Sequence, residues 1–123
     1  MSLPIAFLDA VARLIPKDRR FDDPLSTLAF GTDASFYRLI PQLVVRVESE
    51  DEVVELLQLA QRDRVPVTFR AAGTSLSGQA GTDGVLADVR RHFTGVEILD
   101  DGARVRVQPG VTVKQLNAHL APY

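Results

Sequence analysis

The chain has no cysteine, no excess of positive charge and no long hydrophobic run in its 123 residues. Without cysteine it can form neither disulfides nor thiolate metal sites, which fits the reducing cytoplasm where we predict it to be. A formal net charge of −2 argues against nucleic-acid binding, because such proteins need a basic face to neutralise phosphates. No apolar run approaches the roughly 18 residues that span a bilayer, so we predict no membrane span.

Several familiar catalytic and metal-binding motifs are also missing. The two histidines, His92 and His119, lie far apart and lack the spacing of metal ligands, so we predict no metal site. The chain's small-residue loop has no Gly-Lys-Ser/Thr of a P-loop, and Gly73 and Gly78 do not fit Gly-x-Gly-x-x-Gly. Ser77 stands where a nucleophile elbow needs glycine, which argues against a hydrolase serine.

That loop, residues 70–80, is the most informative feature of the chain. It follows residues 65–69, whose apolar alternation predicts a short buried strand. Gly73 and Gly78 can take positive φ angles without steric cost, so successive N–H groups can turn toward one point. Such a concave run of amides binds anions, and the hydroxyls of Thr74, Ser75 and Ser77 add donors. The loop therefore suits a phosphate or pyrophosphate, although a plain connection between strands explains its composition equally well.

Periodicity and capping signals predict an α+β fold. Helices are expected over residues 4–14, from Asp23-Pro24 over Leu25 and Leu28, over residues 49–62, and after the Thr112/Gln115 capping box. Strands are expected at residues 43–47, 66–69 and 85–88, with a hairpin joining 96–99 to 103–107 through Asp100-Asp101-Gly102. Residues 16–23 are expected to be a loop outside the sheet.

The order strand, helix, strand predicts a small parallel βαβ core with flanking helices. Along the helix faces we expect Ile5, Leu8, Val11 and Leu14 inward in the first, and Val53, Leu56, Leu57 and Ala60 in the third. In parallel sheets of this kind ligands sit beyond the carboxyl ends of the strands. The small-residue loop leaves the carboxyl end of the second predicted strand, where a ligand is expected.

The loop also carries a resemblance to a family of flavoenzymes. The residues that match are Pro66, Val67, Arg70, Gly73, Thr74, Ser75 and Gly78. Together they resemble the first flavin-binding motif of FAD enzymes of the vanillyl-alcohol oxidase and p-cresol methylhydroxylase type. Residues 41–53 resemble that family's opening strand and helix, and residues 105–120 resemble the element after the flavin loop. Many members have glycine where Ala71 and Ala72 stand, so the backbone of this loop has fewer accessible conformations.

Residues 30–38, Phe-Gly-Thr-Asp-Ala-Ser-Phe-Tyr-Arg, resemble the bacterial D-lactate and D-2-hydroxyglutarate dehydrogenase branch of the family. The resemblance implies that residues 1–123 are a partial FAD-binding domain, the N-terminal subdomain of a longer enzyme that oxidises a D-2-hydroxy acid. It implies FAD as the cofactor and places the catalytic residues outside this chain. Here Asp33 and Ser35 could lie near the flavin, but a local Asx-type turn explains them equally well.

The cofactor-binding residues that the resemblance implies all lie in the loop. They are Arg70, Ala71, Ala72, Gly73, Thr74, Ser75, Ser77, Gly78 and Gln79. Most would act through backbone N–H groups, whereas Arg70 would either brace the loop or pair with a phosphate. The expected partner is the remainder of the parent flavoenzyme, and the isolated chain is expected to self-associate. A stand-alone anion-binding or protein-interaction module without catalysis is the alternative.

Overall fold

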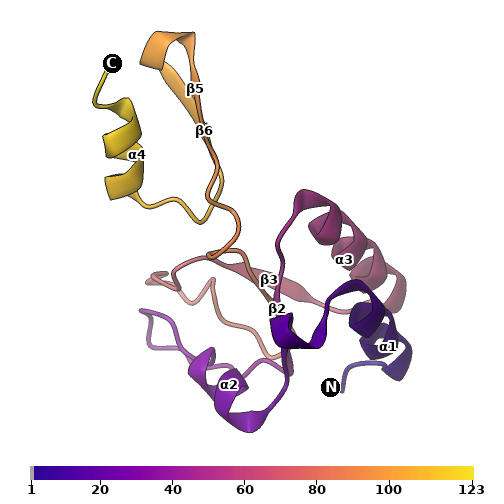
Figure 1. Cartoon of the computed structure of the whole chain (residues 1–123). Helices are drawn as coiled ribbons and strands as arrows, with labels where there is room; N and C mark the ends of the chain where they lie inside the picture. Colours follow the sequence, from indigo (N-terminus) through magenta and orange to yellow (C-terminus); the bar gives the residue numbers. More distant parts are fainter. Residues whose placement is uncertain (1) are drawn as a thin grey trace.

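The computed structural model describes residues 2–123, which form a mixed α/β body and a projecting hairpin (Figure 1). The helices are α1 (Ile5–Leu14), α2 (Pro24–Ala29), α3 (Glu50–Asp63) and α4 (Val113–Leu120), with 3-10 turns η1 (Lys17–Arg19) and η2 (Asp100–Gly102). The strands are β1 (Arg20–Phe21), β2 (Leu43–Arg46), β3 (Val67–Arg70), β4 (Val85–Asp88), β5 (Val96–Leu99) and β6 (Arg104–Val107). The predicted α+β fold is confirmed.

A four-stranded sheet in the order β1-β2-β4-β3 forms the centre of the body. Strands β2 and β3 both pair with β4 in parallel, so the predicted parallel core is correct and β4 lies between the other two. Every residue of β4 is buried, as are the first three of β2. A near-continuous apolar run is what a strand covered on both faces requires.

Two expectations about the sheet were wrong. Residues 16–23 are not a loop outside it, because Arg20 and Phe21 pair antiparallel with Val45 and Val44 at one edge. At the opposite edge, β3 is not a buried strand, since the Phe69 side chain is 42% exposed. The alternation of apolar residues identifies a strand, but whether another element covers it is decided elsewhere in the chain.

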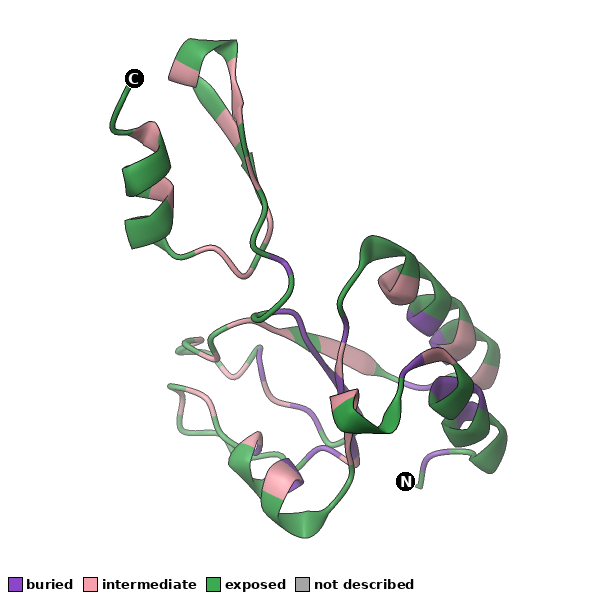
Figure 2. Cartoon of the chain, in the orientation of Figure 1, coloured by how far each residue is buried: buried purple, intermediate pink, exposed green. Residues whose placement is uncertain are grey.

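Helices α1 and α3 lie side by side against the sheet and enclose the main hydrophobic core (Figures 1 and 2). The buried face of α1 is centred on Phe7, Ala10 and Val11, whereas Ile5 is 77% exposed and Leu8 is also exposed. The face of α1 that we predicted to be buried therefore differs by a rotation from the face that is buried, and two of its residues lie toward solvent. In α3 the inward positions include Leu56 and Ala60 as expected, but Leu57 is exposed.

The hairpin β5–β6 and helix α4 extend away from this body (Figure 1). The predicted capping box is present at α4, where Thr112 and Gln115 each bond the other's backbone N–H. No residue of β5, β6 or α4 is buried, in contrast to the sheet (Figure 2). Large apolar side chains stay accessible here, among them Val107 and Val113. Within residues 2–123, no helix is both long and apolar enough to cross a membrane.

Candidate flavin-binding site

The small-residue loop leaves β3 at Arg70, on the edge of the sheet where the three parallel strands end. This is the edge where open α/β sheets bind ligands. Both predicted backbone features are present, because Gly73 has a φ of 70° and Gly78 a φ of 77°. The loop residues Ala71, Gly73, Ser75 and Gly78 are half-buried, and Ala72, Thr74, Ser77 and Gln79 are exposed.

An almost unbroken run of backbone amides in the loop has no hydrogen-bond partner. Among residues 2–123, the N–H groups of residues 72–76 and of Gly78 donate to no protein atom. Backbone donors are normally paired unless water or a ligand satisfies them. The run therefore has the donor capacity that an oxyanion requires, and the exposed hydroxyls of Thr74 and Ser77 stand beside it.

Ser75 has a different role from the one the sequence indicated. Its Oγ donates to Gln79 Oε1 at 2.6 Å and accepts from the N–H groups of Ser77 and Gln79, each at 3.2 Å. The hydroxyl thus closes the second half of the loop on itself and is not a free donor. The backbone N–H of Ser75 remains in the unpaired run.

Arg70 braces the loop from the inside. Its Nη1 donates to the carbonyl oxygens of Thr32 at 2.8 Å and Phe30 at 3.3 Å, and its guanidinium lies 5.5 Å from the centre of the Phe30 ring. Gly73 lies directly against it, because a β-carbon there would approach Arg70 Nε to 2.6 Å. Of the two roles left open for Arg70, bracing is the one that its contacts show.

Residues 30–38 form the second wall of the site, which the spacing of residues alone did not predict. Ala34 donates its N–H to the carbonyl of Gly73 at 3.2 Å, so this segment is attached to the loop. On the other side, a β-carbon on Gly78 would approach the Tyr37 ring to 2.7 Å. Both loop glycines are therefore required by close contacts within the protein as well as by their φ angles.

Asp33 lies in the predicted Asx-type turn in this second wall. Its carboxylate accepts from the N–H of Ser35 at 2.8 Å and from the Ser35 hydroxyl. The hydroxyl is the main reason why the pKa of Asp33 lies below its ordinary value, with the Ser35 amide adding to the effect. Asp33 is thus a carboxylate at neutral pH, and one of its oxygens shapes the turn.

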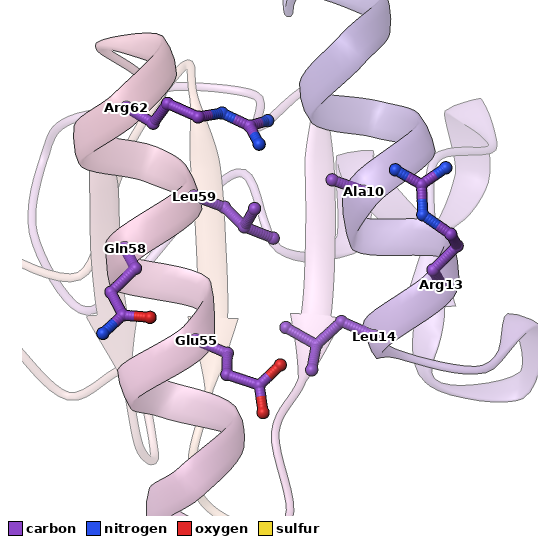
Figure 3. A pocket seen from close by; sticks show the side chains of 7 residues that line it. All are labelled: Ala10, Arg13, Leu14, Glu55, Gln58, Leu59 and Arg62. Carbon is purple, nitrogen blue, oxygen red and sulfur yellow. The ribbon is translucent and has the colours of Figure 1, made fainter.

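A separate cavity in the body contains none of the residues of the loop or of its second wall. It measures about 530 Å³ and lies between α1 and α3, where Leu14, Leu59 and Glu55 face the gap (Figure 3). Arg13 and Arg62 also line it. Among residues 2–123, no group of three or more His, Cys, Asp and Glu side chains is placed to hold a metal ion.

The family described as FAD binding domain matches residues 41–123 of the chain, which include all of the loop. D-2-hydroxyglutarate dehydrogenase from Pseudomonas putida is 34% identical over 121 residues, covering 95% of this chain and 12% of that protein. The glycolate oxidase subunit GlcD of Escherichia coli is 41% identical over 91 residues, covering 72% of this chain and 18% of that protein. The chain thus spans between a tenth and a fifth of the length of these relatives.

Solved structures agree on the fold. The chain superposes on alkyldihydroxyacetonephosphate synthase with a TM-score of 0.82 at 20% identity, covering 98% of this chain and 25% of that one. It superposes on p-cresol methylhydroxylase with a TM-score of 0.76 at 13% identity, covering 95% of this chain and 24% of that one. The expected p-cresol methylhydroxylase type fold and the expected cofactor, FAD, are both confirmed. The chain belongs to the FAD-binding domain family.

Proposed function

We propose that this chain is the N-terminal part of the FAD-binding domain of a longer flavin-dependent dehydrogenase that oxidises a D-2-hydroxy acid. The relatives support the substrate class, since they include D-2-hydroxyglutarate dehydrogenases and subunits of glycolate oxidase, and glycolate is itself a 2-hydroxy acid. D-2-hydroxyglutarate and D-lactate are the two candidate substrates. A cytoplasmic location stays a prediction from the absence of cysteine.

The observation that carries the proposal is the run of unpaired amides in residues 72–76 and at Gly78. A pyrophosphate needs several hydrogen-bond donors that point toward it. Main-chain N–H groups at a turn can supply them. The Ser75–Gln79 closure and the Arg70 brace hold these amides in place before any ligand arrives. Ala72, Gly73, Thr74, Ser75 and Gly78 would therefore hold the pyrophosphate of FAD mainly through their backbone.

When bound, the flavin supplies the hydride-accepting group of the reaction. The residues of this chain bind and orient it, and we assign none of them to proton transfer. Asp33 is engaged in its turn, and the two histidines are exposed and outside the loop. The catalytic base and the groups that bind the substrate carboxylate belong to the parts of the enzyme beyond this chain.

The alternative is a stand-alone anion-binding or interaction module. It requires a closed polar surface, whereas this chain exposes Val107, Val113 and Phe69. Exposed apolar side chains on the hairpin, α4 and β3 favour a domain that packs against further parts of a larger protein. The partner we propose is therefore the remainder of the flavoenzyme.

The test uses the full-length protein from its natural reading frame. Purified protein is mixed anaerobically with D-lactate, D-2-hydroxyglutarate, glycolate and the L-enantiomers, and the visible flavin band is followed. We expect the band to bleach with a D-2-hydroxy acid and not with its L-enantiomer. A protein without flavin would contradict the cofactor assignment, and a bound flavin that no 2-hydroxy acid bleaches would contradict the substrate class.

A further inference from the structure

A second cavity, of about 390 Å³, lies at the base of the loop where β2, β3 and β4 end. Four arginines line it, namely Arg46, Arg70, Arg90 and Arg91, together with Asp88 and Phe30. The chain as a whole is acidic, with a formal net charge of −2. The four arginines that line this cavity are therefore a local concentration of positive charge and not part of a generally basic surface. We call this cavity the arginine pocket.

One carboxylate does not balance four guanidinium groups. Asp88 is 6% exposed and accepts from Arg46 Nε at 3.0 Å and from the backbone N–H of Arg90 at 3.0 Å. Its charge is thus taken up by Arg46, which also lies over the Phe21 ring at 5.1 Å. Among the residues that line the pocket, four arginines stand against one aspartate, so the lining carries an excess of positive charge.

The four arginines fall into two pairs with different freedom. Arg46 and Arg70 are fixed, the first by Asp88 and the second by the carbonyl oxygens of Phe30 and Thr32. The Arg90 and Arg91 side chains are exposed and, among residues 2–123, make no ion pair or hydrogen bond. The pocket thus combines two fixed arginines with two whose side chains are free to bind an anion.

We propose that the arginine pocket binds a phosphoryl group, separately from the backbone amides of the loop. A carboxylate is planar and is satisfied by one guanidinium fork, whereas a tetrahedral phosphate presents oxygens in several directions. The four arginines stand at or just after the ends of three strands, so the pocket offers more than one guanidinium fork. The phosphoryl group would belong to a phosphorylated compound other than the flavin, because the proposed function already assigns the flavin pyrophosphate to the loop amides.

The experiment titrates inorganic phosphate into the full-length flavoenzyme by calorimetry, in flavin-loaded and flavin-stripped form. The test variant is Arg90→Gln/Arg91→Gln, which removes the two free donors. The matched control is Arg104→Gln/Arg106→Gln, which removes the same charge from exposed ion pairs on β6. We expect phosphate affinity to fall at least tenfold in the test variant and to stay within twofold in the control.

The two forms of the enzyme distinguish the arginine pocket from the loop amides. Binding to the flavin-loaded form supports the proposal, and binding to the stripped form alone would contradict it, because phosphate would then only replace the flavin pyrophosphate at the loop amides. The absence of phosphate binding in both forms would overturn the proposal, as would an equal loss in both variants or tighter binding of malonate than of phosphate. The flavin content of the wild type, measured on the same samples, tests the proposed function separately.

Discussion

Replacing Arg70 tests how the flavin loop is held. The side chain makes two hydrogen bonds to carbonyl oxygens, at 2.8 and 3.3 Å, and a cation–π contact with Phe30 at 5.5 Å. Arg70 is half-exposed, so the lower ends of the usual ranges apply: about 1.5 kcal/mol for each hydrogen bond and about 0.5 kcal/mol for the aromatic contact. Arg70→Met therefore removes about 3.5 kcal/mol that orders the loop and residues 30–38.

This loss should appear in flavin affinity more than in global stability. A loop that must first be ordered binds with an affinity reduced by the fraction of ordered molecules. An ordering cost of about 3.5 kcal/mol corresponds to a flavin dissociation constant raised by roughly 300-fold. The assay is titration of the stripped full-length protein with FAD, followed by the quenching of flavin fluorescence. Thermal midpoints are compared on stripped proteins, because bound flavin itself raises the midpoint.

Arg70→Lys separates bracing from direct charge pairing. A lysine keeps the positive charge but cannot reproduce the guanidinium fork that spans two carbonyl oxygens. If Arg70 is a brace, the lysine variant loses nearly as much affinity as the methionine variant. A lysine variant with wild-type affinity would refute this reasoning, and so would a methionine variant with wild-type affinity.

Gly73 offers an independent check of the same contact. Gly73→Ala adds a β-carbon that clashes with the Arg70 guanidinium, at a position whose φ is 70°. In an Arg70→Ala background the clash disappears and only the backbone strain remains, at about 1 kcal/mol. The two substitutions should therefore be strongly non-additive in flavin affinity. Additive effects would show that Gly73 and Arg70 act independently.

Three further predictions concern the body and the isolated chain. The Arg19–Glu52 pair, at 2.6 Å with side chains 12% and 14% exposed, lowers the pKa of Glu52 mainly through the Arg19 hydrogen bond. Its contribution is complete above the unfolded pKa of about 4.3 and is lost as pH falls through the lower folded value. Glu52→Gln should thus cost about 1.5 kcal/mol at pH 7 in urea unfolding, and an unchanged midpoint would contradict this. The 123-residue chain alone should self-associate through the exposed edge of β3 and the hairpin, and a clean monomer in light scattering at high concentration would count against it. That chain should also purify without stoichiometric FAD, because the loop's unpaired amides are open on one side. A full flavin band after gel filtration would disprove this.

Local sequence signals predicted most of the elements. Periodicity and capping rules predict features that depend only on neighbours in the chain. These features are the buried runs of β2 and β4, the caps of α3 and α4, and the glycine-containing loop. Arg70 was visible as part of a motif, but its partners Phe30 and Thr32 lie 40 and 38 residues away. No local rule connects positions so far apart.

Burial was the least predictable property. Ile5 and Phe7 lie about 160° apart around α1, on nearly opposite sides, and the position of α3 and the sheet decides which side is covered. Likewise β1 is only two residues long and is a strand because β2 offers it a partner edge. These features depend on tertiary contacts, which the order of residue types along the chain does not specify.

Hydrogen–deuterium exchange of the loop amides tests the central claim most directly. The N–H groups of residues 72–76 and Gly78 have no protein partner, so they should exchange quickly in the flavin-stripped full-length enzyme. If they hold the pyrophosphate, FAD should slow their exchange markedly, while the exposed hairpin turn at residues 100–103 serves as a reference whose exchange rate stays unchanged. Protection confined to residues 72–78 is the predicted result. Equally fast exchange in the loaded and stripped enzyme would show that the loop only connects β3 to the rest of the chain.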